Sequence, residues 1–261
     1  MKTEELILIT NDDGFKAKGL KVLKSIAQKL SDNVWEFSPL SNNSGKSHSI
    51  TINKKIKIKQ LDKKIFVVDG TPVDCVIFGS KYLARKKLRP TTILSGINHG
   101  QNMGTDLIYS GTVAAAREGS MQEIKSFSVS LEKNKQASNW KTVAYFLPKI
   151  LLSIKNLNLE TKVFYNINFP NQKIENIKGC KIVKPGKRKP GELSKIIKGK
   201  NNNYYFLVPS ERRTHKTAKA NEDEYEMKKS FITISYHLNS NFNEKFIASK
   251  LAQAIRKTIE K

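Results

Sequence analysis

Short apolar runs alternate with amphipathic stretches through the first part of the chain. Residues 5–10 (ELILIT) predict a buried strand, and residues 19–30 carry apolar side chains at helical spacing. Further strands are predicted at 33–39, 50–58, 64–70, 91–96 and 126–132, and further helices at 71–87, 110–122 and 138–155. Thr71 followed by Pro72 is typical of a helix start. This alternation indicates βαβ units and a mainly parallel, doubly wound α/β sheet.

Beyond residue 160 the pattern changes to β-type runs separated by basic spacers. These runs lie at 162–170, 179–186, 203–209 and 230–238, and an amphipathic helix is predicted at 242–260. Residues 184–203 are expected to form a projecting hairpin or loop. No repeat or long linker divides the chain. We therefore expect one domain over residues 1–261, with about 160–240 forming a β-rich extension.

Length and composition indicate an ordinary globular protein. The chain has 261 residues and two distant cysteines, Cys75 and Cys180, without metal-type spacing. Acidic residues precede the short N-terminal apolar run, unlike a signal peptide. A run of about 18 apolar residues, as a membrane helix needs, is absent from the sequence. A cytoplasmic protein without disulfides and without a membrane association is the expectation.

The net charge of +24 raises the question of nucleic-acid binding. Only seven of the 47 basic residues are arginine, and the lysines are spread along the whole chain. Phosphate-reading surfaces favour arginine. The charge is therefore interpreted as solvated lysine faces, which can still attract anionic substrates over long range.

Three polar loops follow predicted strands: residues 11–14 (NDDG), 38–49 (SPLSNNSGKSHS) and 97–112 (INHGQNMGTDLIYSGT). The carboxyl ends of parallel strands meet at one edge of a sheet, so these loops are expected to form one site. The adjacent carboxylates of Asp12 and Asp13 repel each other, and a divalent cation such as Mg²⁺ or Mn²⁺ would offset that repulsion. The alternative is an Asx-type turn that caps the next helix, with Gly14 at positive φ.

Residues 110–112 (SGT) precede small helix-forming residues. This pattern predicts a helix N-terminus whose N–H groups and hydroxyls can bind an anion such as phosphate. An ordinary N-cap is the alternative. Asp106 in the preceding loop is interpreted as a ligand or as an acid that braces the loop.

Two further features were weighed against simpler explanations. Residues 45–47 (GKS) match the end of a P-loop, but Leu40 stands where that motif needs its first glycine, which argues against a nucleoside triphosphatase. His48 and His99 lie in site loops, where a histidine assists proton transfer or serves as a hydrogen-bonding bystander.

These loops, in this order, resemble the SurE family of metal-dependent nucleotide phosphatases. The matching segments are ILITNDDG, SGKSHSIT, GTPVDCV, LSGINHGQNMGTDLIYSGTVAAAREG and NINFP. The resemblance implies a Rossmann-like three-layer sandwich with a β-rich C-terminal hairpin excursion that builds a homodimer or homotetramer. It also implies hydrolysis of nucleoside 5′-monophosphates, and of 3′-monophosphates as a second class, with one Mg²⁺ or Mn²⁺ ion.

The same resemblance assigns roles to individual residues. The metal ligands would be Asp12, Asp13, Ser44 and Asn98. The phosphate would contact Asn11, Asn98, Ser110, Gly111 and Thr112. Asp12 and Asp13 would be catalytic, and whether Asp12 acts as base, nucleophile or only as a ligand stays open. Arg188, in the basic segment 184–188, is a weaker candidate for a place near the site.

The C-terminal part departs from the family pattern. Residues 230–238 (SFITISYHL) lack the family's glycine and proline, and the segment before them matches only through Asp223. These departures concern the oligomer interface and the substrate preference, because the catalytic loops are intact. Two other functions are kept as alternatives. One is a nucleotide-binding sensor without catalysis, and the other is a basic nucleic-acid-binding protein.

Overall fold

The computed structural model describes residues 3–157, 162–187, 193–209, 218–238 and 249–255. Its strands are β1 (Thr3–Thr10), β2 (Ser31–Pro39), β3 (Ile58–Asp62), β4 (Ile65–Val68), β5 (Thr92–His99), β6 (Lys125–Leu131), β7 (Val163–Phe169), β8 (Cys180–Ile182), β9 (Lys195–Lys198), β10 (Tyr204–Leu207) and β11 (Ile232–Leu238). Its α-helices are α1 (Lys18–Leu30), α2 (Pro72–Arg85), α3 (Gly111–Met121), α4 (Trp140–Asn156) and α5 (Asp223–Lys228). Two 3₁₀ turns are η1 (Gly104–Ile108) and η2 (Ile174–Asn176).

One nine-stranded sheet forms the centre of the described structure. Its strand order is β3-β4-β2-β1-β5-β6-β7-β11-β8. The strands from β4 to β7 in that order all run parallel, whereas β3 and β11 are antiparallel to their neighbours β4 and β7. The expected mainly parallel α/β sheet is confirmed.

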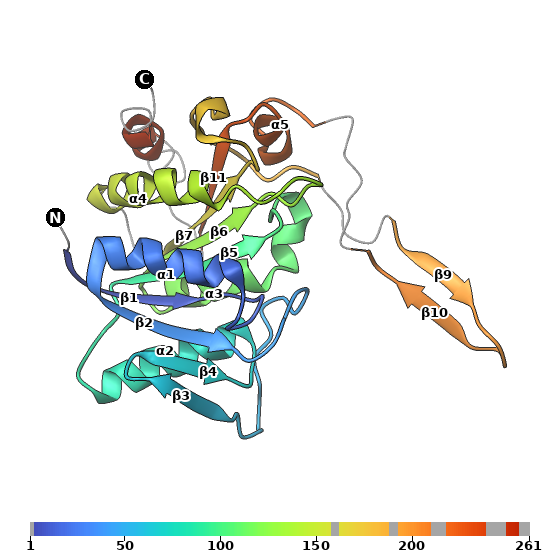
Figure 1. The fold of residues 1–261 in the computed structure, drawn as a ribbon, viewed down its shortest axis with the longest axis horizontal. Coiled ribbons are helices and arrows are strands. Elements are labelled where there is room, and N and C mark those ends of the chain that lie inside the picture. The colour runs from blue at the N-terminus through green and yellow to red at the C-terminus, as the bar shows by residue number, and fades with distance from the viewer. Residues whose placement is uncertain (1–2, 158–161, 188–192, 210–217, 239–248, 256–261) are drawn as a thin grey trace.

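Helices cover both faces of this sheet, so the body has three layers (Figure 1). Apolar side chains of α1 and α4 pack on one face, together with the helical residues 249–255 near the C-terminus. On the other face, α2 and α3 pack over an aromatic cluster that includes Trp35, Phe37 and Phe66. The predicted start of α2 is also present, because Thr71 and Asp74 form a reciprocal capping box.

The strand order creates a crevice between β1 and β5. From β1 the chain winds outward through β2 and β4 on one side, and through β5, β6 and β7 on the other. At such a reversal the loops beyond the strand ends diverge and leave room for a ligand. The polar loops after β1 and β5 therefore lie at the position where ligands bind in open parallel sheets.

The strand predicted over residues 50–58 is wrong for most of its length. Residues 50–57 form no strand, and β3 begins only at Ile58. The Asp74 carboxylate accepts hydrogen bonds from both the backbone N–H and the hydroxyl of Thr51, at 3.0 and 2.7 Å. Ile50 and Ile52 are exposed, so their alternation with polar residues does not mark a buried face. The helix predicted over 242–260 is present at 249–255, and its other residues lie outside the described ones.

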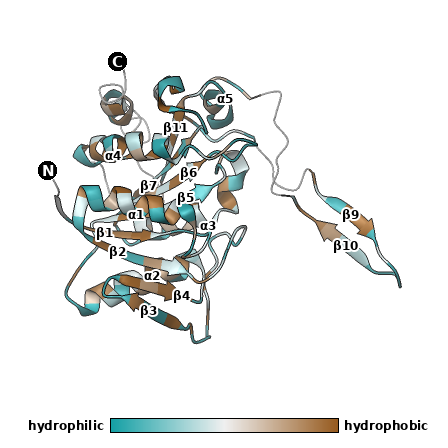
Figure 2. Ribbon diagram, viewed as in Figure 1, coloured by the Kyte–Doolittle hydropathy of each residue, from teal (hydrophilic) through white to brown (hydrophobic). Residues whose placement is uncertain are grey.

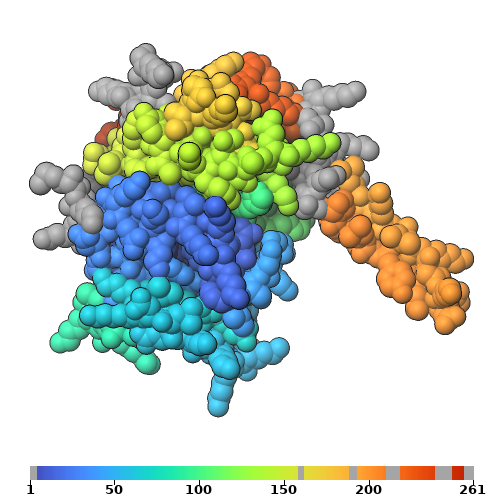
Figure 3. Space-filling model, in the orientation of Figure 1, coloured from blue at the N-terminus to red at the C-terminus, as the bar shows by residue number. Residues whose placement is uncertain are grey.

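A hairpin of β9 and β10 extends away from the body, and we call residues 195–207 the arm (Figures 1 and 3). The expected projecting element thus exists, although it lies later in the chain than the predicted 184–203. Apolar side chains on it are exposed, and Figure 2 shows both strands of the arm as partly hydrophobic. The exposed apolar residues are Ile196, Ile197, Tyr204, Tyr205, Phe206 and Leu207.

Candidate functional site at the carboxyl end of the sheet

A cleft of about 920 Å³ opens at the crevice between β1 and β5. Five of the residues predicted for the site line it: Asp12, Asp13, Ser44, Asn98 and Ser110. Asn11, Gly111 and Thr112 lie behind these residues and are fully or nearly fully buried. Arg188 lies outside the described residues. The structure thus brings three loops that are distant in sequence around one cleft, as the sequence predicts.

Asp12 is a buried carboxylate held by the start of α3. The Thr112 hydroxyl donates a hydrogen bond of 2.5 Å to Asp12 Oδ1, and the Thr112 backbone N–H also binds this side chain. Burial and the neighbouring charge of Asp13 raise the pKa of Asp12 to about 6, although the bonds from Thr112 act in the opposite direction. Asp12 therefore exchanges a proton close to neutral pH more easily than an ordinary aspartate.

Asp13 has a different environment, since it is only half-buried. Its Oδ2 accepts a hydrogen bond of 3.1 Å from the backbone N–H of His99, at the end of β5. This bond ties the loop after β1 to the neighbouring strand. The two adjacent carboxylates therefore face the same cleft with different burial and different partners.

Asn11 supports this loop from beneath. Its Nδ2 donates to the carbonyl of Gly14 at 2.9 Å, and its Oδ1 is buried without a hydrogen-bond partner among the described residues. Gly14 has a φ of +97°, as the turn interpretation expected. Neither aspartate caps α1, however, because its N-cap is Ala17, which makes no side-chain bond. Asn11 therefore helps to fix the turn that contains Asp12 and Asp13.

Asn98 reaches the cleft from β5 because of the glycine two residues before it. Gly96 has a φ of +139°, and a Cβ there would lie 2.4 Å from the carbonyl oxygen of Val129. This local backbone coincides with a shift in the register between β5 and β6. Asn98 Nδ2 donates to the Gly100 carbonyl at 2.7 Å, which leaves Oδ1 as the oxygen available to a ligand.

Ser44 belongs to a loop that crosses the cleft mouth. Asp12 fixes one part of this loop, since its carbonyl accepts from the N–H of Asn43 at 2.7 Å. Ser47 fixes another part by donating its N–H and its hydroxyl to the carbonyls of Tyr109 and Ile108. Ser44 itself is exposed. The loop is thus anchored on both sides of the one hydroxyl that the resemblance assigns to the metal.

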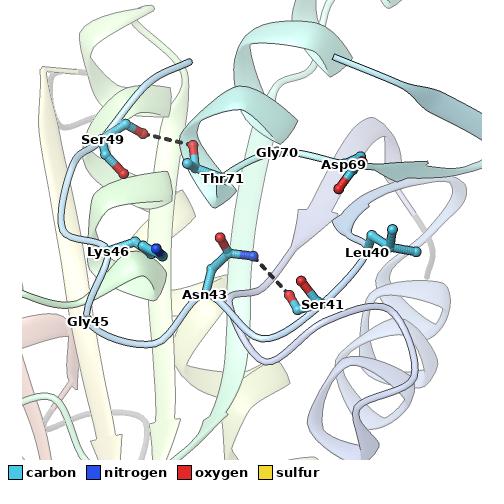
Figure 4. A pocket seen from close by; sticks show the side chains of 9 residues that line it. All are labelled: Leu40, Ser41, Asn43, Gly45, Lys46, Ser49, Asp69, Gly70 and Thr71. Atoms are coloured by element: carbon cyan, nitrogen blue, oxygen red, sulfur yellow. Dashed lines mark hydrogen bonds between the residues drawn. The ribbon is translucent and has the colours of Figure 1, made fainter.

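A second hollow of about 480 Å³ lies on the other side of the same loop. Figure 4 shows Asn43, Lys46 and Ser49 lining it opposite Asp69 and the turn before α2. The Thr71 hydroxyl donates to the Ser49 carbonyl across this hollow at 2.7 Å. None of the residues predicted for the site lines it. The hydrogen bond between Thr71 and Ser49 helps to fix the loop that carries Ser44.

At the start of α3, the hydroxyls of Ser110 and Thr112 already form hydrogen bonds within the protein. Ser110 is the N-cap, and its hydroxyl accepts from the N–H of Val113 at 3.1 Å. A Cβ on Gly111 would lie 2.9 Å from the Cβ of Asp12, so only glycine allows this close approach. Thr112 is fully buried and its hydroxyl and N–H serve Asp12. The start of α3 therefore stabilises the Asp12 carboxylate and places Ser110 on the cleft wall, and the phosphate contacts of Ser110, Gly111 and Thr112 stay a prediction.

Several cleft residues were missed by sequence reasoning. Lys133, Asn134 and Lys135 come from the connection after β6 and place positive charge at the cleft. No motif marks these lysines in a chain that is rich in lysine throughout. Of the two histidines predicted to lie in site loops, His99 lines the cleft, and its Nε2 lies 3.0 Å from the Ser138 hydroxyl. The other, His48, pairs with Glu118 at 3.1 Å. Asp106 also lines the cleft and is buried.

The donor set at the cleft suits a hard divalent cation. Asp12 and Asp13 supply carboxylate oxygens, and Ser44 and Asn98 supply neutral oxygens, the combination that Mg²⁺ and Mn²⁺ prefer. In the described part of the chain, no three side chains of His, Cys, Asp and Glu gather as a zinc-type cluster. The residues of this donor set therefore fit one oxygen-liganded ion.

Fold and site together define a doubly wound α/β protein with an oxygen-rich, carboxylate-bearing cleft at its topological switch point. The chain belongs to the SurE family, since the family model described as Survival protein SurE matches residues 7–192. The expected family and fold class are thereby confirmed.

Curated relatives carry the name 5′-nucleotidase SurE. The one from Nitrobacter winogradskyi is 39% identical over 206 residues, which cover 77% of this chain and 80% of that protein. The one from Afipia carboxidovorans is 37% identical over 207 residues with the same coverage. The crystal structure of the Sure protein from Aquifex aeolicus matches with a TM-score of 0.79 at 28% identity, covering 94% of this chain and 97% of that one.

None of the helices in the described residues is both long and apolar enough to cross a bilayer.

Proposed function

We propose that this chain is a metal-dependent 5′-nucleotidase that hydrolyses nucleoside 5′-monophosphates to nucleoside and phosphate. The observation that carries the proposal is the convergence of Asp12, Asp13, Ser44 and Asn98 on one cleft. The names of the curated relatives support the same substrate class. Whether 3′-monophosphates are also hydrolysed belongs to the proposal's test.

The cleft residues are assigned to two roles, metal binding and attraction of the substrate. Asp12 and Asp13, with Ser44 and Asn98, would hold one Mg²⁺ or Mn²⁺ ion, which would stabilise negative charge on the phosphoryl group when bound. Lys133 and Lys135 would draw the anionic substrate into the cleft.

Asp12 is the residue we assign to proton transfer. Without a bound cation, its pKa of about 6 lies closer to neutral pH than that of an ordinary aspartate. The Thr112 hydroxyl and backbone N–H both bind this carboxylate and orient it, and we assign the carboxylate to take a proton from the attacking water. Direct attack by Asp12 on phosphorus is the competing mechanism, and trapping of a phosphorylated protein would distinguish the two.

We further propose that the arm assembles the chain into a homodimer or homotetramer. Exposed apolar side chains on both strands, such as Ile196 and Phe206, are costly to leave in water. The arm itself extends away from the body, where a second copy can cover these side chains (Figures 1 and 2). The two cysteines of the chain are unpaired, which agrees with our proposal of a cytoplasmic location.

The direct test measures phosphate release from a panel of 5′- and 3′-monophosphates with Mn²⁺, with Mg²⁺ and with a chelator. Metal-dependent release from the 5′-monophosphates supports the proposal and ranks the bases. Binding of nucleotides with metal but without release would favour the sensor instead. Salt-sensitive duplex binding without release would favour the nucleic-acid-binding alternative.

A further inference from the structure

The cleft wall between Asn98 and Ser110 is held from below by buried side chains of the sheet. Asn168 accepts the N–H of Asn102 at 2.8 Å, and Asn166 and Asn168 both donate to the Asn102 carbonyl at 2.9 Å. Asn166 and Asn168 lie on β7 and are 1% exposed. This network explains the NINFP segment of the sequence and fixes Asn102, which lines the cleft.

Two residues further along, the same wall is held by a carboxylate from outside the sheet. Asp223, the first residue of α5, accepts the N–H of Gly104 through Oδ2 at 2.8 Å. Gly104 begins the turn that carries Asp106 into the cleft. Asp223 is 1% exposed. It contacts Gly104 although more than a hundred positions separate the two residues in the sequence.

The other oxygen of Asp223 holds the chain that leads toward the arm. Oδ1 accepts the N–H of Gly186 at 2.9 Å, as well as the N–H of its neighbour Glu224 at 2.8 Å. The Asp223 backbone N–H donates to the carbonyl of Lys184 at 3.0 Å. Leu193, two residues before the arm, also lines the cleft. One buried carboxylate therefore joins the cleft wall to the segment before the arm.

We propose that Asp223 is a positioning residue for the reaction, which holds the Gly104 cleft wall and the Gly186 segment in a fixed relation. The inference rests on the proposed nucleotidase function, because it assigns Asp223 to the geometry of that cleft. Asp223 does not line the cleft and is not assigned to the metal or the phosphate.

The chemistry of this contact requires a carboxylate. Three backbone N–H groups converge on its two oxygens, and an amide offers only one oxygen, with an NH₂ group at the other position. In Asp223→Asn, the N–H of either Gly104 or Gly186 must therefore face the asparagine NH₂ group, which is itself a donor. That buried N–H is left without an acceptor. Burial raises the pKa of Asp223, and the three N–H bonds oppose that rise and favour the charged form.

Glu226 provides a matched control on the same helix. It is 2% exposed, and its carboxylate accepts from Lys181 at 2.8 Å and from the N–H of Asn221 at 3.1 Å. Neither of these partners lines the cleft. Glu226→Gln thus makes the same chemical change at the same depth without touching the cleft wall.

The experiment compares D223N and E226Q by amide hydrogen exchange and by steady-state phosphate release from AMP with Mn²⁺. We expect D223N to speed exchange at the Gly104 and Gly186 amides and to lower kcat at least tenfold, whereas E226Q changes neither. Wild-type kinetics in D223N, or equal losses in both variants, would overturn the positioning role. If D223N does not fold, the wild-type protein decides: exchange at Gly104 or Gly186 as fast as that of an exposed, unbonded amide would overturn the shared contact.

The two proposals fail in distinguishable ways. A wild-type protein that releases no phosphate overturns the nucleotidase proposal and with it the catalytic part of this inference. The exchange measurement does not depend on turnover. Unchanged exchange at both glycines in D223N overturns the contact itself, whether or not the wild-type protein is active.

Discussion

The Thr112 hydroxyl donates a 2.5 Å hydrogen bond to Oδ1 of Asp12, where Thr112 is fully buried behind the cleft and Asp12 is a nearly buried residue of the cleft wall. The family resemblance assigns Thr112 to the phosphate. In this structure its hydroxyl donates to a carboxylate that would otherwise be less well stabilised in its charged form. We therefore expect the first helical turn of α3 to act on the substrate through Asp12.

This relation predicts the kinetic effect of removing the hydroxyl. Thr112→Val should lower kcat by about tenfold or more, since a hydrogen bond to a charged group is worth about 1.5–3 kcal/mol. Thr112→Ser keeps the hydroxyl and should retain most of the activity. Steady-state kinetics with a nucleoside monophosphate and Mn²⁺ would check this. An increase in KM alone would show that Thr112 contacts the substrate instead.

Burial of Asp12 predicts a pH-dependent stability of the metal-free protein. The pKa of about 6 in the folded state lies above the ordinary 3.8, so the folded protein binds this proton more tightly than the unfolded chain does. Stability from this group is therefore present below about pH 4 and is lost as the pH rises through about 6. Asp12→Asn removes this loss, and it should stabilise the metal-free protein at pH 8 by an amount on the order of 3 kcal/mol.

Thermal unfolding in the presence of a chelator measures this difference. The gap between wild type and Asp12→Asn should be small at pH 4, grow up to about pH 7 and stay constant above that. With Mn²⁺ the order should reverse, because only the carboxylate binds the cation well. A variant no more stable than wild type at pH 8 without metal would contradict the assigned environment of Asp12.

The arm gives a prediction that is independent of the site. Ile196 and Phe206 are paired across its two strands and are 73% and 66% exposed. Replacing both by serine should convert a dimer or tetramer into monomers without unfolding the body, since neither residue contributes to the described core. Light scattering coupled to gel filtration would measure the mass. The polar change Lys198→Ser on the same arm is the control, and an unchanged mass in the double variant would refute the assignment.

Much of the fold could be predicted because hydrophobic pattern and chain order are local properties of the sequence. The strands at β1, β5 and β6 and the start of α2 at Thr71 follow from such patterns. The alternation of apolar and polar residues over 50–57 does not mark a strand, because a tertiary contact holds this segment in another conformation. Thr51 is tied to Asp74, twenty-three positions away.

The site was predictable to the extent that its residues occur in recognisable loops. Asp12, Asp13, Ser44 and Asn98 follow from the three polar loops and the family pattern. Lys133 and Lys135 could not be separated from the other lysines of a chain with 47 basic residues. The role of Asp223 depends on two backbone N–H groups, at Gly104 and Gly186, which no side-chain pattern reveals.

The central claim is that the paired carboxylates make the cleft a metal-dependent nucleotidase site. The most direct measurement is phosphate release from AMP by wild type, Asp13→Asn and the exposed control Asp62→Asn, each with Mn²⁺ and with a chelator. We predict release only with Mn²⁺, near-complete loss in Asp13→Asn and full activity in Asp62→Asn. Release that persists in the chelator, or in Asp13→Asn with Mn²⁺, would contradict the claim.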